Sequence, residues 1–129
     1  MNLDRPIDQI HNHADLAVSM AREDMGMPIG FDRAGVEWLD GFIQRRHEER
    51  RDKDFYKRLT QTLGSYFGEC IIREYGGSWK LVQGSWCVMF DNSNGVFPFA
   101  KVEKHLRYGA DDSVLGLYNS IAVLFRLGN

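Results

Sequence analysis

Apolar residues recur at intervals of three and four along the first half of the chain, the spacing of helices that bury one face. The pattern predicts a helix over residues 6–24, a second beginning near Asp32, and a third over residues 52–75. A stretch rich in Gly and Pro separates the first two. The third has the most regular spacing, so we expect it to be the central helix of the core. Its apolar residues are Phe55, Leu59, Leu63, Tyr66, Phe67, Cys70 and Ile71.

Two glycines stand inside this third helix. Gly64 and Gly68 share one ridge with Thr60 and Ile72, at four-residue spacing. Each glycine costs about 1 kcal/mol of helix propensity relative to alanine. We therefore expect close packing on this ridge, with the backbone of another helix or a strand as the neighbour.

After the third helix, short runs of aromatic and β-branched residues replace the helical spacing. Runs at 79–82 and 86–90 predict two strands joined by a turn at 83–85, and a polar turn at 91–95 leads to a short strand at 96–97. These strands form an antiparallel meander. Alternation puts apolar side chains on both of its faces, so one face packs on helices and the other needs cover from the N-terminal helices or a partner.

Two further helices are expected at the C-terminal end. Pro98 suits the first position of a helix that ends at Gly109. Residues 111–113 offer the N-cap of the last helix, over residues 114–127, which is apolar on most sides. Such a helix must be buried in the core or against a partner subunit.

The predicted fold is therefore α+β, with three N-terminal helices, a small three-stranded antiparallel sheet and two C-terminal helices. A chain of 129 residues has the size of one domain, and we expect a single domain over residues 1–129. Residues 1–50 form its helical N-terminal part, and residues 52–127 form the core helix, the meander and the C-terminal helices.

The charge balance argues against nucleic acid and membranes as partners. Lys and Arg number 16 against 18 Asp and Glu, so no overall positive field attracts phosphate backbones or anionic lipid. Residues 45–58 carry an excess of cations, seven Lys or Arg against four Asp or Glu. Their mixed signs indicate a solvated helix surface, and a phosphate-binding patch is the alternative.

No segment indicates export or membrane insertion. Charged residues are scattered through the first 15 positions, where a secretory signal needs an apolar segment. The longest uncharged stretch, residues 113–125, is shorter than the roughly 20 residues that cross a bilayer. Cys70 and Cys87 lack the spacing of a zinc or redox motif, so we expect free thiols in the cytoplasm.

The histidines and cysteines form no catalytic or metal-binding motif. His11 and Asp15 lie one helical turn apart, but His13 points away from His11 and no further ligand has a typical spacing. The two cysteines would be nucleophiles only if a distant histidine, His47 or His105, came close in the fold. We therefore predict no metal, no cofactor and no catalytic residue.

Glu69 is the one carboxylate embedded in an apolar run. Burial would raise its pKa and suit it to acid–base chemistry. Alternatively, Glu69 accepts hydrogen bonds from the hairpin backbone or pairs with Lys101 or Lys104, anchoring the helix to the sheet.

Three segments, at residues 63–69, 76–79 and 98–104, together resemble a family of small bacterial α+β domains. The family has a Leu-Gly-x-x-x-Gly-Glu helix, a Gly-x-Trp hairpin and a Pro-Phe-x-Lys-Val helix, and the resemblance covers residues 63–118. It implies this topology and a bacterial cytoplasmic setting, and transfers no catalytic residue. Relatives of this architecture include immunity and antitoxin proteins.

These features predict a non-enzymatic protein-binding domain, in its sharpest form an immunity or antitoxin protein that occludes a cognate toxin. Its polar loops would face a basic toxin cleft. The predicted contact residues are Asp91, Asn92, Asn94, Asp111 and Asp112.

Two alternatives stay open. One is a small enzyme or ligand-binding domain that uses Glu69 in an aromatic pocket. A solvent-filled cleft where Glu69 meets a histidine or a cation would favour this alternative over protein binding. The other is a homodimer built on the last helix, so the protein is expected to be a monomer or a homodimer.

Overall fold

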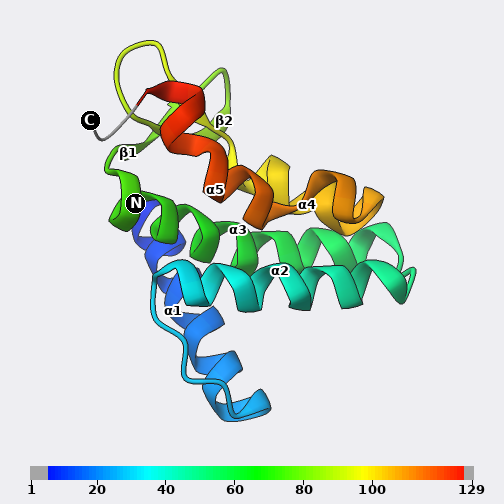
Figure 1. The fold of residues 1–129 in the computed structure, drawn as a ribbon. Coiled ribbons are helices and arrows are strands. Elements are labelled where there is room, and N and C mark those ends of the chain that lie inside the picture. The colour runs from blue at the N-terminus through cyan, green and yellow to red at the C-terminus, as the bar shows by residue number, and fades with distance from the viewer. Residues whose placement is uncertain (1–5, 127–129) are drawn as a thin grey trace.

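The computed structural model describes residues 6–126, which form five α-helices, one short 3₁₀ helix and a three-stranded sheet (Figure 1). In chain order they are α1 (Pro6–Met25), α2 (Arg33–Glu48), α3 (Lys53–Tyr75), β1 (Ser78–Val82), β2 (Ser85–Met89), β3 (Gly95–Val96), α4 (Pro98–Tyr108), η1 (Ala110–Asp112) and α5 (Val114–Phe125). This order confirms the predicted α+β fold. The predicted end of the last helix at Leu127 lies outside the described residues.

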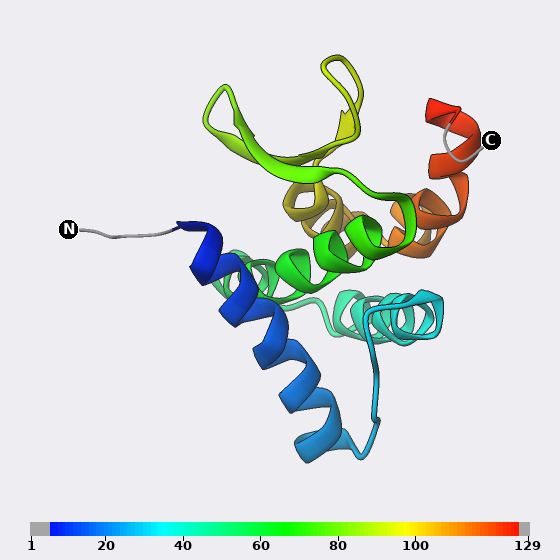
Figure 2. The same cartoon turned by 90° about the vertical axis from the view of Figure 1, so that its left-hand side faces the viewer.

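Helix α3 is the centre of the molecule. Figure 2 shows it between the sheet on one side and α1 and α2 on the other. Its buried side chains include Tyr66, Phe67 and Ile71, each 0% exposed, and they belong to one hydrophobic cluster that reaches from α1 to α5. The prediction that α3 is the core helix is confirmed.

Side-chain caps and proline set where the helices begin. The carboxylates of Asp32 and Asp52 accept hydrogen bonds from backbone N–H groups in the first turns of α2 and α3, at 3.0 and 2.9 Å. Pro98 occupies the first position of α4, where a missing N–H costs nothing. Ser113 caps α5 by accepting from Gly116 N–H at 3.0 Å.

The glycine ridge of α3 lies against two aromatic rings. A Cβ atom on Gly68 would overlap the ring of Trp79 from β1, and one on Gly64 would overlap Phe99 from α4. The predicted close packing is thus confirmed. The neighbour was expected to be a backbone segment, but at both glycines it is mainly an aromatic side chain. A flat ring reaches further into the groove than a neighbouring main chain.

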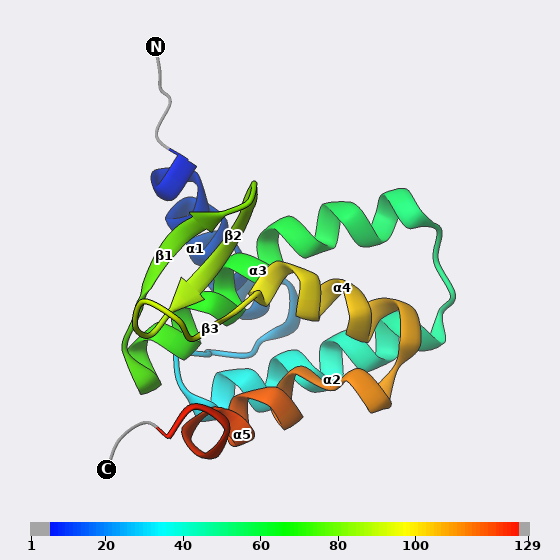
Figure 3. The ribbon, with the colours of Figure 1, turned by 90° about the horizontal axis from the view of Figure 1, so that it is seen from above.

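The sheet is antiparallel in the order β1-β2-β3. Gln83 and Gly84, both with positive φ, form the tight turn between β1 and β2, so Ser85 belongs to the strand and not to the predicted turn. Trp79 pairs with Val88, and both are buried toward α3. Figure 3 shows the opposite face with no helix of the described chain over it, so α1 and α2 do not supply the expected cover.

Helix α5 is buried along one face only. Val114, Tyr118 and Ile121 are at most 1% exposed, whereas Val123 is 81% and Leu124 61% exposed. Of the two expected modes of burial, the core accounts for one face of α5 and not for the whole helix, because the neighbours of α5 lie along a single side. Burial against a partner subunit stays a prediction.

Candidate functional site

Glu69 joins three elements of the fold. Its side chain leaves the middle of α3 and is 12% exposed. The carboxylate oxygen Oε2 accepts a hydrogen bond from the indole N–H of Trp79 at 2.9 Å, and it lies 3.3 Å from Nε2 of His11 on α1. Glu69 therefore links α3 to the hairpin and to α1.

Small residues bring α1 close enough for this contact. Ala14, Ala17 and Ala21 are buried on the face that α1 turns to α3, and a face of alanines lets two helices approach closely. His11 and Asp15 lie one turn apart at the edge of that face, as the sequence predicted. The side chain of His11 is 52% exposed, so its ring reaches solvent.

Glu69 opens onto a hollow of about 240 Å³ between α1 and α3. We call it the Glu69 hollow, and its lining residues are His11, Ala14, Asp15, Phe31, Glu69 and Arg73. The guanidinium carbon of Arg73 lies 4.1 Å from the ring centre of Phe31, a cation–π contact that holds the cation at the hollow's edge. Two carboxylates, one imidazole and one guanidinium therefore surround a small space.

The arrangement is suited to binding a polar molecule. Both contacts of Glu69 use Oε2, and neither uses Oε1. A carboxylate accepts several hydrogen bonds, and a guanidinium donates paired bonds to an anionic group. His11 and Glu69 could exchange a proton, but the lining includes no hydroxyl or thiol to act as a nucleophile.

The sequence predicted part of this role. Anchoring of helix to sheet is what Glu69 does, but its partner is an indole side chain and not the hairpin backbone. Lys101 pairs with Asp112 instead, at 3.7 Å. The contact with His11 was not foreseen, because no local pattern tells how α1 crosses α3.

The loop after β2 uses its own polar groups to hold its shape. The carboxylate of Asp91 accepts hydrogen bonds from Ser93 N–H, Asn94 N–H and the Asn94 side chain, at 2.8 to 2.9 Å. These bonds lower the pKa of Asp91, with the side-chain bond from Asn94 the largest cause. Asn92 is exposed at the tip of this loop.

The predicted partner-contact residues do not gather on one surface. Asp111 and Asp112 belong to η1, beyond the C-terminal end of α4, whereas the loop of Asp91 lies beyond the sheet at the other end of the molecule (Figures 1 and 3). A single small cleft would not contact both groups. Their role in partner binding stays a prediction.

Neither cysteine is an activated nucleophile. Burial raises the pKa of the Cys70 thiol to about 12, and burial also raises the pKa of Cys87. Both thiols are free and stay protonated at neutral pH.

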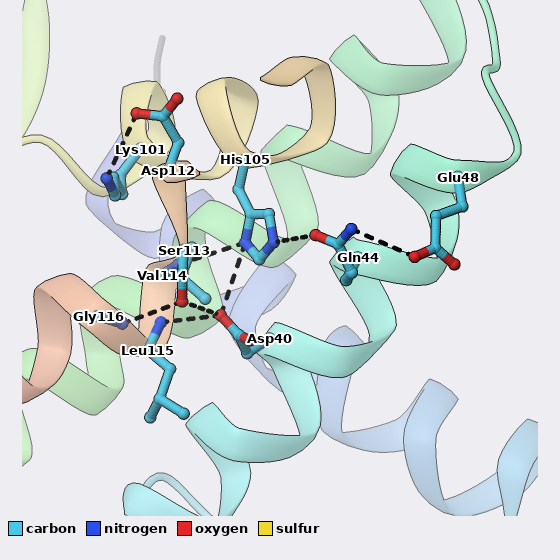
Figure 4. Close-up of polar contacts among 10 residues, drawn as sticks. All are labelled: Asp40, Gln44, Glu48, Lys101, His105, Asp112, Ser113, Val114, Leu115 and Gly116. Carbon is cyan, nitrogen blue, oxygen red and sulfur yellow. Dashed lines mark hydrogen bonds and ion pairs between the residues drawn. The ribbon is translucent and has the colours of Figure 1, made fainter. Parts of the chain in front are cut away.

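A second histidine, His105, lies in a sealed network that we call the His105 joint (Figure 4). The ring is 0% exposed; its Nδ1 accepts from Val114 N–H at 3.3 Å, and its Nε2–H donates to the Gln44 side chain at 3.1 Å. Asp40 accepts from the hydroxyl of Ser113 and from Leu115 N–H.

The joint contains Ser, His and Asp but not the geometry of a hydrolase. The hydroxyl of Ser113 donates to Asp40 and not to His105, so no base activates it. Burial is the main cause that lowers the pKa of His105 and keeps the ring neutral. The joint therefore fastens α2 to α4 and α5.

A further hollow, of about 550 Å³, lies between the hairpin and the N-terminal parts of α3 and α4. We call it the aromatic groove, and its lining residues are Lys57, Thr60, Gln61, Ser85, Trp86, Phe97, Phe99, Ala100 and Glu103. Phe97 is 42% exposed there. An exposed aromatic beside an open groove is typical of a binding surface.

Known proteins add nothing to this geometry: the chain matches no protein-family model, no curated protein and no solved structure. Within residues 6–126, no three His, Cys, Asp or Glu side chains are placed to hold a metal ion. Over the same residues, every helix is too short or too polar to cross a membrane.

Proposed function

We propose that the protein is a small ligand-binding domain and that its ligand occupies the Glu69 hollow. The observation that carries the proposal is the Glu69 side chain, 12% exposed, whose carboxylate faces a histidine in a hollow shared with an arginine. Burying a carboxylate costs free energy unless partners compensate. Here one partner, His11, is exposed to solvent, so a ligand can reach the pair.

The size and charges of the hollow indicate the class of ligand. About 240 Å³ is less than the roughly 300 Å³ at which pockets for drug-sized molecules begin. A small zwitterion fits this space, with a cationic group at Glu69 and an anionic group at Arg73. Free amino acids have this size and charge pattern.

The test is a titration with a panel of free amino acids, followed by NMR of the backbone and of the His11 ring. We expect saturable shifts around the Glu69 hollow. Glu69→Gln should weaken binding about tenfold or more, because a hydrogen bond to a charged group contributes about 1.5–3 kcal/mol. The amide oxygen of Gln still accepts from Trp79, so folding should be preserved.

Glu37→Gln is the matched control, because Glu37 is an exposed helical carboxylate that pairs with Arg33 at 3.5 Å. Its binding should equal that of the wild type. The proposal fails if no amino acid gives saturable shifts in the hollow. It also fails if Glu69→Gln changes stability and leaves binding unaltered, since Glu69 would then be a structural anchor alone.

A protein-binding domain is the second candidate, favoured by the exposed Phe97 in the aromatic groove. In this version the protein is an immunity or antitoxin protein, the groove holds part of a cognate toxin, and the acidic loops lie at the rim. Like the first candidate, it acts in the reducing cytoplasm, where free cysteines persist.

Purification from the source cells tests this second candidate. A toxin should copurify in stoichiometric amount and be lost in Phe97→Asp, but not in Tyr108→Asp, which changes another exposed aromatic, 64% exposed, outside the groove lining. Full survival of toxin-exposed cells that lack the gene would contradict it.

A homodimer built on α5 has one supporting observation, the exposure of Val123 and Leu124. Sedimentation at several protein concentrations tests it, with Val123→Asp expected to give a monomer. A wild-type monomer at every concentration would exclude it.

A further inference from the structure

A second charged hollow, of about 490 Å³, lies where α2 ends, α3 begins and α4 ends. Figure 3 shows the turn between α2 and α3 beside the C-terminal end of α4. We call it the basic hollow, and its lining residues are His47, Glu48, Arg50, Arg51 and Arg107. The fold thus adds Arg107, far away in the sequence, to the cation-rich run of residues 45–58.

Two of the three arginines are held in place by neighbours. The guanidinium carbon of Arg51 lies 3.7 Å from the ring centre of Phe55, and the side chain pairs with Glu49 at 3.6 Å. Arg107 pairs with Glu103 at 3.1 Å, one turn earlier on α4. Each of these pairs leaves other N–H groups of the guanidinium free to bind.

Arg50 gives the hollow its unbalanced positive charge. Its φ of 54° places it in the left-handed region at the turn, and within residues 6–126 no ion pair joins it to a carboxylate. The lining contributes three guanidiniums, those of Arg50, Arg51 and Arg107, and one carboxylate, that of Glu48. An anion would restore the balance.

His47 supplies a further hydrogen-bonding group at the same place. Its Nδ1–H donates to the carbonyl oxygen of Leu106 at 2.9 Å, and this bond fixes the orientation of the ring. The other ring nitrogen, Nε2, takes no part in it. Gly109 makes room for the ring, because a Cβ atom there would lie 2.8 Å from Nε2. The imidazole is therefore locked beside the arginines.

We propose that the basic hollow binds the phosphate group of a small phosphorylated molecule. Planar guanidiniums donate paired hydrogen bonds that match phosphate oxygens, and arginine stays charged at every physiological pH. The volume exceeds that of one phosphate and leaves space for an organic part. A nucleic acid is disfavoured, because it needs a long positive track and the chain has a formal net charge of -2.

The experiment uses three probes at constant ionic strength: inorganic phosphate, phenyl phosphate and a short single-stranded DNA. Binding is followed by NMR of the arginine Nε–H groups and by calorimetry. We expect saturable binding of phosphate or phenyl phosphate, with shifts at Arg51 and Arg107. Tighter binding of phenyl phosphate identifies a phosphomonoester as the ligand, and equal binding identifies phosphate alone.

Arg107→Gln and Arg50→Gln should each weaken this binding about tenfold or more. The matched control is Arg22→Gln on α1, an exposed arginine with one carboxylate neighbour at 3.4 Å, which should bind like the wild type. The two test variants lie in different parts of the fold, Arg50 in the α2–α3 turn and Arg107 on α4, so a folding defect in one leaves the other informative.

Non-saturating shifts with both phosphates, or equal losses in Arg22→Gln, would overturn the proposal. So would tighter binding of the DNA that depends on Arg50 and Arg107, because the ligand would then be a nucleic acid. None of these outcomes bears on the Glu69 hollow, which has no residue in common with this site.

Discussion

The Glu69 hollow and the His105 joint both place a carboxylate opposite an imidazole, but the partner that is more exposed to solvent differs between them. In the hollow the His11 side chain is 52% exposed and that of Glu69 12%, whereas in the joint His105 is 0% exposed and Asp40 24%. A histidine that reaches water can meet a ligand, but one sealed by backbone and amide groups can only connect helices. The exposure of the imidazole therefore decides which pair is a candidate site.

The largest expected effect is the loss of the sealed ring. His105→Ala removes a buried side chain and leaves Val114 N–H and the Gln44 amide without their partner, which should cost about 3 kcal/mol of unfolding free energy. His11→Ala should cost less than about 1 kcal/mol, because the ring is half exposed. Urea denaturation of both variants measures their unfolding free energies. Equal losses in the two variants would contradict the contrast between the sealed and the exposed histidine.

The second prediction concerns the contact that positions Glu69. Gly68→Ala pushes a methyl group against Trp79 and should cost about 1–3 kcal/mol by overpacking, despite the better helix propensity of alanine. Gly41→Ala is the control, because its methyl group would meet only the flexible end of Arg45 at 3.4 Å. That control should be neutral or stabilising by up to about 1 kcal/mol. Thermal unfolding separates the two, and a stable Gly68→Ala would show that the hairpin moves freely.

The smallest expected effect is a pH dependence from the joint. Burial lowers the pKa of His105 below its ordinary value of 6.5, while Asp40 opposes the shift. Below pH 6.5 the unfolded chain takes up a proton that the folded chain refuses, so stability should fall as the pH decreases toward the lowered pKa. Above 6.5 this contribution is fully retained.

Unfolding free energies from about pH 7.5 to 5 measure this dependence. His105→Gln is the comparison, because it removes the titrating ring and should flatten that part of the profile. Identical slopes in the variant and the wild type would assign the dependence to other groups.

Local chemistry made the helix starts predictable. The residues that start the helices act on backbone groups within a few positions of themselves: Asp32 and Ser113 by accepting a hydrogen bond, and Pro98 by its fixed φ angle. Each could be identified in the sequence. The regular spacing of α3 predicted the core in the same way. Those features need no knowledge of distant parts of the chain.

The sites depend on distant neighbours. Gln44 reaches His105 across 61 positions, and Arg107 joins the arginines of the α2–α3 turn only because α4 ends beside it. The glycine at position 68 predicted that another part of the chain packs closely on α3, but it could not identify that part as the ring of Trp79. Spacing reveals that a face is buried and cannot identify its partner.

Two successive residues of α3 hold the indole of Trp79. Gly68 leaves room for the ring, and the Glu69 carboxylate accepts a hydrogen bond from its N–H. Phenylalanine at position 79 would fill the space without donating, and a smaller polar residue would donate without filling it. Tryptophan satisfies both demands. The indole therefore fixes the position of the hairpin along α3, and any sliding of the sheet would break the bond that holds the Glu69 carboxylate at the edge of the Glu69 hollow.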